Sequence, residues 1–216
     1  MPSSNSRCNK SLSDHHVTLA APFFAREYPV VTYSFRPAYT FPVWQPVAAV
    51  RPAMSAPWWQ WVASTDSLTA RLIKAGGERP FRVRLLHQGV GMPWKDEAQA
   101  LNIGHRRYAW LREVALCVDE SPWVVARSVA PLTQLQGQHL DRLGERSLGS
   151  WLFQQPDLVR GPLEASACAP RFAYPACNNA QSLWGRRSVF QHGGLSLLVQ
   201  EYFLTNMADD LRLPSR

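Results

Sequence analysis

The clearest pattern along the chain is an alternation of apolar and polar positions, which is typical of β-strands with one buried face. Residues 108–118 and 122–129 form two such runs, and only Asp119-Glu120-Ser121 separates them. A connection this short predicts an antiparallel hairpin. These two runs are therefore expected to pair along their whole length.

Three further strands are predicted on the same grounds. Residues 186–191 and 195–204 flank His192-Gly193-Gly194, which predicts a second hairpin, and residues 81–85 alternate like a single strand. Several hairpin strands joined by a few helices indicate an α+β domain built on an antiparallel sheet.

Two short helices are predicted where a serine precedes an apolar run, because a serine side chain caps the free backbone N–H groups of a helix start. They lie at residues 66–77, which end on two glycines, and at residues 147–153. Residues 132–143 are interpreted as a helical connection. Residues 161–182, which contain prolines and two cysteines, are interpreted as a long loop.

Proline content and hydrophobic periodicity divide the chain into three parts. Residues 1–56 contain seven prolines and no sustained period, which favours an extended or disordered leader. Residues 57–207 carry all the predicted helices and strands and are expected to form one domain. Residues 208–216 are left as a C-terminal tail.

Three charged residues interrupt the apolar faces of predicted strands. Arg112 lies among Trp110 and Val114, Arg127 follows Trp123 and Val125, and Glu201 stands on the side of Leu197, Val199 and Phe203. Burying an unpaired charge costs several kcal/mol. Such residues must therefore pair with one another or be reserved for a ligand.

Both alternatives stay open at this level, but the charges do not balance. Two arginines face one glutamate, so an internal ion pair leaves one positive charge without a partner, and a small anion in a closed pocket would supply one. The planar arginine fork suits a carboxylate. Helix starts at Leu68 and Leu148 would add free backbone N–H groups, which favour anions but occur in every helix.

The composition limits the partners of the protein. The net charge of +7 and the pI near 9.6 fit a nucleic acid, an anionic membrane surface, an anionic substrate or a solubilising surface without a role. The basic residues are dispersed and only three are lysines, which weakens the nucleic-acid interpretation. The tryptophans at 58, 59 and 61 are interpreted as packing residues rather than as a base-stacking surface.

Other chemistry classes find little support in the sequence. No apolar run is long enough for a transmembrane helix and no signal peptide is apparent. Cys8, Cys117, Cys168 and Cys177 are too scattered for a disulfide scaffold or a zinc site, and free thiols in a reducing cytoplasm fit best. A Cys168–Cys177 disulfide is a minor alternative. We therefore expect no metal.

A family resemblance becomes visible in ordered blocks between about residue 58 and residue 204. The chain resembles bacterial chorismate lyases, and the run at 183–188 is the most specific block. The matching blocks are Trp110-Leu111-Arg112-Glu113-Val114, Cys117, Pro122-Trp123, Ala126-Arg127-Ser128-Val129, Leu143-Gly144, Leu148-Gly149, Leu152-Phe153, Leu183-Trp184-Gly185-Arg186-Arg187-Ser188 and Glu201-Tyr202-Phe203-Leu204.

The resemblance implies a highly connected antiparallel sheet with helical flaps over an internal ligand cavity. It implies that Arg112 and the backbone N–H groups of Leu68 and Leu148 hold the ring carboxylate of the product. Glu201 would meet the 4-hydroxyl group, and Arg127 would act on the enolpyruvyl side. Leu68 stands where a relative has methionine, which a backbone contact tolerates.

The resemblance also implies an activity, the conversion of chorismate to 4-hydroxybenzoate and pyruvate without a cofactor. It places the enzyme in ubiquinone biosynthesis, as a cytoplasmic monomer that binds no nucleic acid. The alternative is a ligand-sensing domain of the same fold, as found in certain transcription regulators. Such regulators carry a winged helix upstream, which the proline-containing residues 1–56 do not supply.

Overall fold

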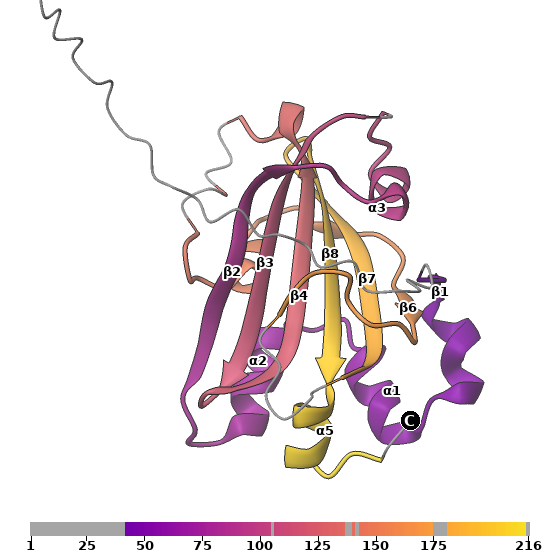
Figure 1. Ribbon diagram of the computed structural model, residues 1–216, viewed down its shortest axis with the longest axis vertical. Coiled ribbons are helices and arrows are strands. Elements are labelled where there is room, and N and C mark those ends of the chain that lie inside the picture. The colour runs from indigo at the N-terminus through magenta and orange to yellow at the C-terminus, as the bar shows by residue number, and fades with distance from the viewer. Residues whose placement is uncertain (1–41, 105, 137–139, 141–142, 175–180, 215–216) are drawn as a thin grey trace, which may run out of the picture. The chain divides into compact units, whose positions relative to one another are not determined.

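The computed structural model describes residues 42–104, 106–136, 140, 143–174 and 181–214. Within them an antiparallel sheet of eight strands runs in the order β1-β6-β7-β8-β4-β3-β2, with β5 beside β7 (Figure 1). The strands are β1 (Gln45–Pro46), β2 (Phe81–Gly91), β3 (Ala109–Val118), β4 (Ser121–Pro131), β5 (Val159–Arg160), β6 (Glu164–Ser166), β7 (Ser182–His192) and β8 (Leu195–Leu204). The predicted α+β class with an antiparallel sheet is confirmed.

The helices are short and gather near the ends of the strands. Figure 1 shows α1, α2 and α5 near one end and α3 near the other. The helices are α1 (Ala56–Val62), α2 (Leu68–Gly76), α3 (Lys95–Ala100), α4 (Leu148–Leu152) and α5 (Thr205–Asp210), with 3-10 turns η1 (Val47–Ala53) and η2 (Leu132–Gln134).

Both predicted hairpins are present, and β4 joins them by pairing with β8. Two of the turns use residues with positive φ. Asp119 has φ 54° in the β3–β4 turn, and Gly193 and Gly194 have φ 52° and 81° in the β7–β8 turn. Glycine adopts such angles without steric cost. The hairpins thus place β3, β4, β8 and β7 side by side.

Both predicted helix caps are confirmed. The Ser67 hydroxyl accepts a hydrogen bond from the Ala70 N–H at 3.4 Å, and the Ser147 hydroxyl accepts one from the Ser150 N–H at 3.3 Å. Gly77, with φ 66°, follows the last residue of α2. Each cap fixes the residue at which its helix begins, so Leu68 and Leu148 are the first residues of α2 and α4.

The sheet separates two layers of packing. On one face, α1 contacts β7, α2 contacts β2 and β3, and α2 and α4 contact each other. On the other face, Phe172, Tyr174 and Trp94 pack on Tyr202 and on the small side chain of Ala115. The charged residues of the central strands are therefore buried from both sides.

A β-bulge in the first hairpin decides which residues share a face. The pairs Val118–Ser121 and Cys117–Pro122 close the turn, but the next pair is Leu116–Val124, so Trp123 is an extra residue. A bulge shifts the register by one, and one position reverses the face of every residue beyond it. Residues after Trp123 therefore face the opposite way from what uninterrupted alternation predicts.

The ends of the domain differ from the predicted boundaries. The expected leader reached residue 56, but Met54 is 3% exposed and the Trp44 indole N–H donates to Asp96 at 3.1 Å. The expected tail begins at residue 208, but Ala208 is buried and the Pro214 carbonyl accepts a hydrogen bond from Trp58 at 2.8 Å. Both ends pack on the domain because their apolar side chains complete its core.

Two connections also differ from expectation. Of the predicted helical connection at 132–143, the described residues show the 3-10 turn η2 and a 3-10 conformation at Leu140, but no α-helix. The predicted loop at 161–182 includes the short strand β6, which pairs with β7. Cys168 is half-buried and free, whereas Cys177 lies outside the described residues.

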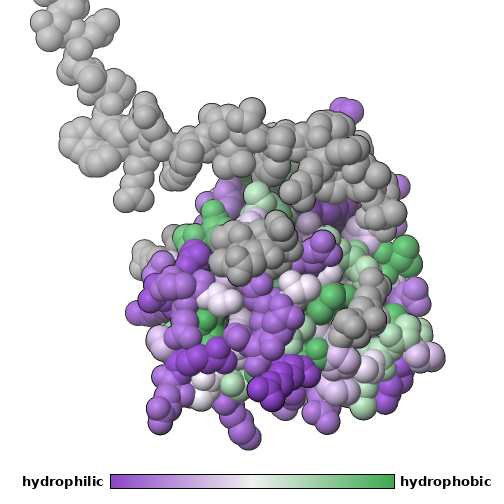
Figure 2. Space-filling model, turned by 60° about the horizontal axis from the view of Figure 1, so that its bottom comes forward, coloured by the Kyte–Doolittle hydropathy of each residue, from purple (hydrophilic) through white to green (hydrophobic). Residues whose placement is uncertain are grey.

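The outer surface is mainly polar, with some apolar side chains exposed. Figure 2 shows one face on which hydrophilic residues predominate and apolar residues form small separate patches. Among the described residues no helix is both long enough and apolar enough to cross a membrane.

Helix α2 offers a matched test of core packing, because it places a fully buried leucine beside an exposed isoleucine. Leu72 is 0% exposed and Ile73 is 47% exposed. We expect Leu72→Ala to lower the free energy of unfolding by about 2 to 5 kcal/mol, since it leaves a cavity. Ile73→Ala should change it by less than about 0.5 kcal/mol. Denaturant unfolding measures both, and equal effects would contradict the assigned packing.

Candidate active site

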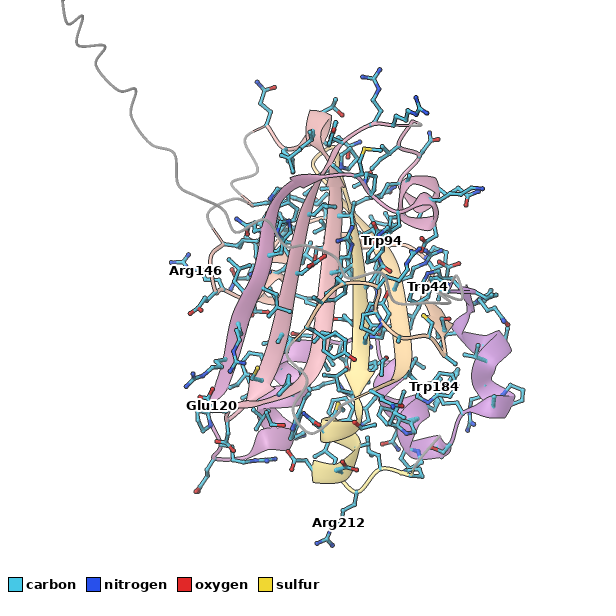
Figure 3. The ribbon with its side chains drawn as sticks, in the orientation of Figure 1. Trp44, Trp94, Glu120, Arg146, Trp184 and Arg212 are labelled. Atoms are coloured by element: carbon cyan, nitrogen blue, oxygen red, sulfur yellow. The ribbon has the colours of Figure 1, made fainter. Side chains whose placement is uncertain are left out.

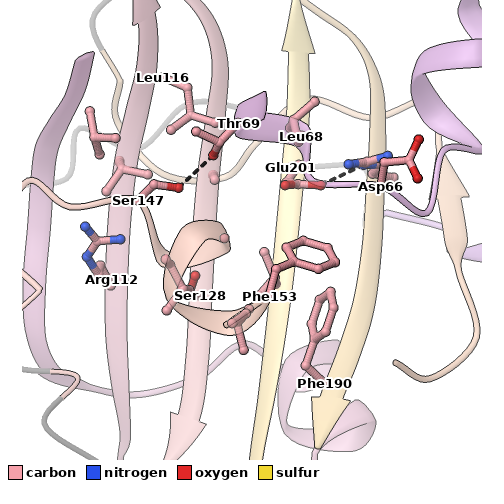
Figure 4. Close-up of a pocket in the computed structure, with 18 of the residues that line it drawn as sticks. Asp66, Leu68, Thr69, Arg112, Leu116, Ser128, Ser147, Phe153, Phe190 and Glu201 are labelled. Carbon is pink, nitrogen blue, oxygen red and sulfur yellow. Dashed lines mark hydrogen bonds and ion pairs between the residues drawn. The ribbon is translucent and has the colours of Figure 1, made fainter. Parts of the chain in front are cut away.

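A cavity lies between the sheet and the starts of helices α2 and α4 (Figure 4). Its floor comes from residues of β2, β3, β4, β8 and β7, and its roof comes from the two helices. The floor is formed by Val83, Arg112, Val114, Leu116, Ala126, Ser128, Val199, Glu201, Arg186 and Phe190, and the roof and rim by Asp66, Leu68, Thr69, Ser147, Leu148, Gly149, Leu152, Phe153 and Arg160. The cavity is thus mainly apolar, with a few charged groups.

Arg112 is a buried cation on the cavity floor. It is 1% exposed, and its Nη2 donates to the carbonyl oxygens of Gly144 and Arg146 at 2.8 and 2.9 Å. Its Nε is buried without a hydrogen-bond partner, and no described carboxylate lies within ion-pair distance. Burial lowers the pKa of Arg112 to about 10. A bound anion would relieve this unfavourable desolvation.

Glu201 lies on the same floor and is held by an arginine. Arg186 stands opposite Glu201 in the β7–β8 pairing, and its Nε donates to Glu201 Oε2 at 2.6 Å. The Nη1 of Arg186 donates to the carbonyls of Trp61 and Ser64 at 2.9 and 2.8 Å. These bonds fix the Glu201 carboxylate in one orientation beside the cavity.

The two helix starts meet over the cavity. The Thr69 and Ser147 hydroxyls are 2.6 Å apart and form a hydrogen bond that links α2 to α4 (Figure 4). Leu68 and Leu148 both line the cavity as first residues of their helices. Their positive helix ends therefore face the same space as Arg112.

Arg160 stands at the rim of the cavity. It belongs to β5, and its Nε donates to the Ser188 hydroxyl at 3.0 Å, while its Nη1 donates to the Thr65 carbonyl at 3.2 Å. Burial lowers the pKa of Arg160, the nearby Arg186 lowers it further, and Glu201 partly counters both effects.

The structure brings together four of the five predicted site residues, Leu68, Arg112, Leu148 and Glu201. Arg127 is the exception. The bulge at Trp123 places Arg127 opposite Glu113 and places Ser128 opposite Arg112. The expectation that Arg127 shares a pocket with Arg112 is therefore corrected, because the register shift turns Arg127 to the other face of the sheet.

On that other face Arg127 belongs to a buried ionic network. Its Nε and Nη2 bind the two oxygens of Glu97 at 2.7 and 3.1 Å, and its Nη1 binds Glu113. Gln200 also donates to Glu97, at 2.5 Å. The guanidinium lies 3.9 Å from the ring centre of Trp94, which is labelled in Figure 3. The donors of Arg127 are thus used within the protein.

The pKa shifts agree with this structural role. Burial alone would lower the pKa of Arg127, but the hydrogen bonds and charges of Glu97 and Glu113 outweigh it and raise the pKa. Burial raises the pKa of Glu113, and the charge of Arg127 partly counters that effect. The charges of Arg127 and Glu113 therefore each favour the ionised state of the other.

Two cavity residues were missed in the sequence. Arg186 lies in the run at 183–188, and alternation along β7 places it on one side with Trp184, Ser188 and Phe190, so the signal was present. Arg160 lies on a strand of two residues, too short for any periodicity to show its direction. No group of three histidine, cysteine or acidic side chains in the described segments is placed to hold a metal ion.

Comparisons with known proteins give a consistent result. The chorismate lyase family matches residues 40–210. A probable chorismate pyruvate-lyase of Chromohalobacter salexigens is 56% identical over 176 residues, which cover 82% of this chain and 96% of that protein. One of Marinobacter nauticus is 41% identical over 149 residues, covering 68% and 76%.

Among solved structures, PhnF of Mycobacterium smegmatis aligns with a TM-score of 0.46 and 14% identity over 65% of this chain and 64% of that chain. A GntR-family transcriptional regulator of Enterococcus faecalis aligns with a TM-score of 0.40 and 13% identity over 58% and 91%. These distant likenesses carry no argument about function.

The ionic network predicts a stability defect that depends on pH. Replacing Arg127 by Met leaves Glu97 and Glu113 buried without their cation, which should cost about 3 to 5 kcal/mol of unfolding free energy at pH 8. The pKa of Glu113, already raised by burial, would rise further. A carboxyl whose folded pKa exceeds its unfolded pKa loses stability as pH rises between the two. The defect should therefore shrink at pH 5.

The matched control for this measurement is Arg82→Met. Arg82 is an exposed arginine, 2.9 Å from Glu120, and its side chain is 54% exposed. Its loss should cost at most about 1 kcal/mol at either pH. If Arg127→Met were as stable as this control but lost ligand binding, Arg127 would act at the cavity after all.

Proposed function

This chain belongs to the chorismate lyase family, and from that membership we propose that it is a chorismate pyruvate-lyase, which converts chorismate to 4-hydroxybenzoate and pyruvate. The observation that supports this most directly is the buried guanidinium of Arg112, which lacks a carboxylate partner among the described residues and faces a partly enclosed, mainly apolar cavity. A benzoate-like carboxylate is the anion that fits such a site.

The floor of the cavity suits a ring with polar groups at opposite ends. Glu201 on β8 stands opposite Ala126, which stands opposite Val114, two residues from Arg112 on β3. The backbones of Arg112 and Glu201 are therefore about 12 Å apart. We assign the ring carboxylate to Arg112 and the backbone N–H groups of Leu68 and Leu148. The 4-hydroxyl is assigned to Glu201, whose Oε2 binds Arg186 and whose Oε1 is available.

The reaction depends more on how the protein positions the substrate than on a catalytic group of the protein. The bond from C3 to the ether oxygen breaks, and that oxygen becomes the keto oxygen of pyruvate. The hydrogen on C4 passes to the methylene carbon, which becomes the methyl group, and the ring becomes aromatic. Holding the enolpyruvyl arm folded over C4 is catalysis by orientation. No metal or organic cofactor takes part in this balance.

Arg127 has no place in this scheme. Arg127 was expected to act on the enolpyruvyl side, but its guanidinium binds Glu97 and Glu113 on the far face of the sheet. We therefore propose that Arg127 supports the sheet behind the cavity. Glu201 has two possible roles in this reaction, as a general base or as a group that orients the 4-hydroxyl.

The wider setting follows from the same family membership. We propose that 4-hydroxybenzoate serves ubiquinone biosynthesis and that the protein acts in the cytoplasm as a monomer. Its partners would be the substrate and the product, without nucleic acid.

The first test of this proposal is direct turnover. Purified protein mixed with chorismate alone should release 4-hydroxybenzoate and pyruvate in equal amounts, followed by chromatography. If chorismate survives while 4-hydroxybenzoate binds tightly, the ligand-sensing alternative replaces the lyase. If neither occurs, the proposed function is wrong.

Replacing Arg112 tests the anion site. We expect Arg112→Gln to weaken 4-hydroxybenzoate binding by about 2 to 5 kcal/mol, because the carboxylate loses its desolvated partner. Arg82→Gln removes the same charge from the exposed surface and should leave the affinity unchanged. Calorimetry measures both constants, and equal affinities for the two variants would refute the assignment.

Replacing Glu201 separates its two possible roles. Glu201→Gln keeps a hydrogen-bond acceptor and removes the charge, so a base would lose about 100-fold or more in kcat. A group that only orients the 4-hydroxyl should lose much less. Unchanged turnover under single-turnover conditions would eliminate the base role.

A further inference from the structure

Chorismate carries two carboxylates, and the assignments above account for only the one on the ring. We propose that Arg160 binds the second carboxylate, on the enolpyruvyl arm, and so fixes the position of that arm. This assignment rests on the proposed function. Arg160 is thereby a substrate-binding residue on a strand far from Arg112 in the sequence.

The charges around Arg160 support this role. Its Nε and Nη1 donate to two neutral acceptors, the Ser188 hydroxyl and the Thr65 carbonyl. No described carboxylate lies within ion-pair distance of it. The neighbouring Arg186 is already paired with Glu201. Asp66, at the rim of the same cavity, lies 3.9 Å from Arg71. Arg160 therefore has no carboxylate partner among the described residues, and its positive charge is left for a ligand.

The strand register places Arg160 and Arg112 at opposite ends of the floor. Ser188, the hydrogen-bond partner of Arg160, stands opposite Val199, which stands opposite Ser128, which stands opposite Arg112. This row spans three strand spacings, about 14 Å between backbones. A dianion whose ring binds Arg112 can therefore extend its second carboxylate toward Arg160.

Other cations near the cavity are less suitable. The Arg186 guanidinium makes three hydrogen bonds to protein oxygens, and Arg127 lies on the far face of the sheet. The Nη2 of Arg160 takes part in none of the hydrogen bonds described. Its guanidinium also lies 5.2 Å from the ring centre of Phe190, which lines the same cavity. This contact keeps the Arg160 guanidinium beside the cavity.

The location also suits the release of pyruvate. Arg160, Phe153 and Phe190 line both the cavity and a second hollow outside it. Phe153 is 45% exposed, so the wall between the two spaces is thin on that side. The enolpyruvyl arm would thus react next to the outer hollow, and pyruvate would form where it can leave first.

The test compares a substrate with two carboxylates and a product with one, using the full chain. We expect Arg160→Gln to lower kcat/KM for chorismate by about 10- to 100-fold, mainly through KM, because the carboxylate is charged in both the ground and transition states. The Kd of 4-hydroxybenzoate should stay within about twofold. Arg160→Lys keeps the charge and should recover part of the loss.

The control for net charge is Arg82→Gln, which should match the wild type in both measurements. An equal loss of chorismate turnover and 4-hydroxybenzoate binding in Arg160→Gln would show that Arg160 acts only through Ser188 and Thr65, and would overturn the assignment. So would an unchanged kcat/KM. A wild type that does not consume chorismate overturns the proposed function as well, which distinguishes the two failures.

Discussion

Burial of charge in the middle of an apolar sheet is the constraint on which this structure depends. The central strands carry arginines and glutamates on both faces, and each would cost several kcal/mol if left alone in a low-dielectric interior. The two faces of the sheet differ in whether their buried charges are paired within the protein. That difference separates the structural half of the domain from its binding half.

On the face covered by α3, the charges are satisfied within the protein. Arg127 binds Glu97 and Glu113, and Glu97 also accepts a hydrogen bond from Gln200. A network of this kind tolerates burial only when all its members are bonded, so it ties α3 firmly to the sheet. The face opposite the cavity is consequently a rigid support.

On the cavity face, the charges are not balanced by the described residues. Glu201 pairs with Arg186, but Arg112 is held only by two carbonyl oxygens and Arg160 only by a carbonyl and a hydroxyl. Two cations at opposite ends of one apolar cavity favour a small dianion. The unpaired buried cations thus lower the free energy of unfolding of the protein alone and provide a site for a ligand.

The sequence by itself determined the five longer strands, the two hairpins, the caps of α2 and α4, and the unusual positions of Arg112 and Glu201. These features depend on local alternation and on residues close together in the chain. Only the tertiary structure decided that Arg127 faces away and that Arg186 and Arg160 face the cavity. The physical reason is register: one extra residue at Trp123 reverses a face, and a strand of two residues takes its direction from its partner.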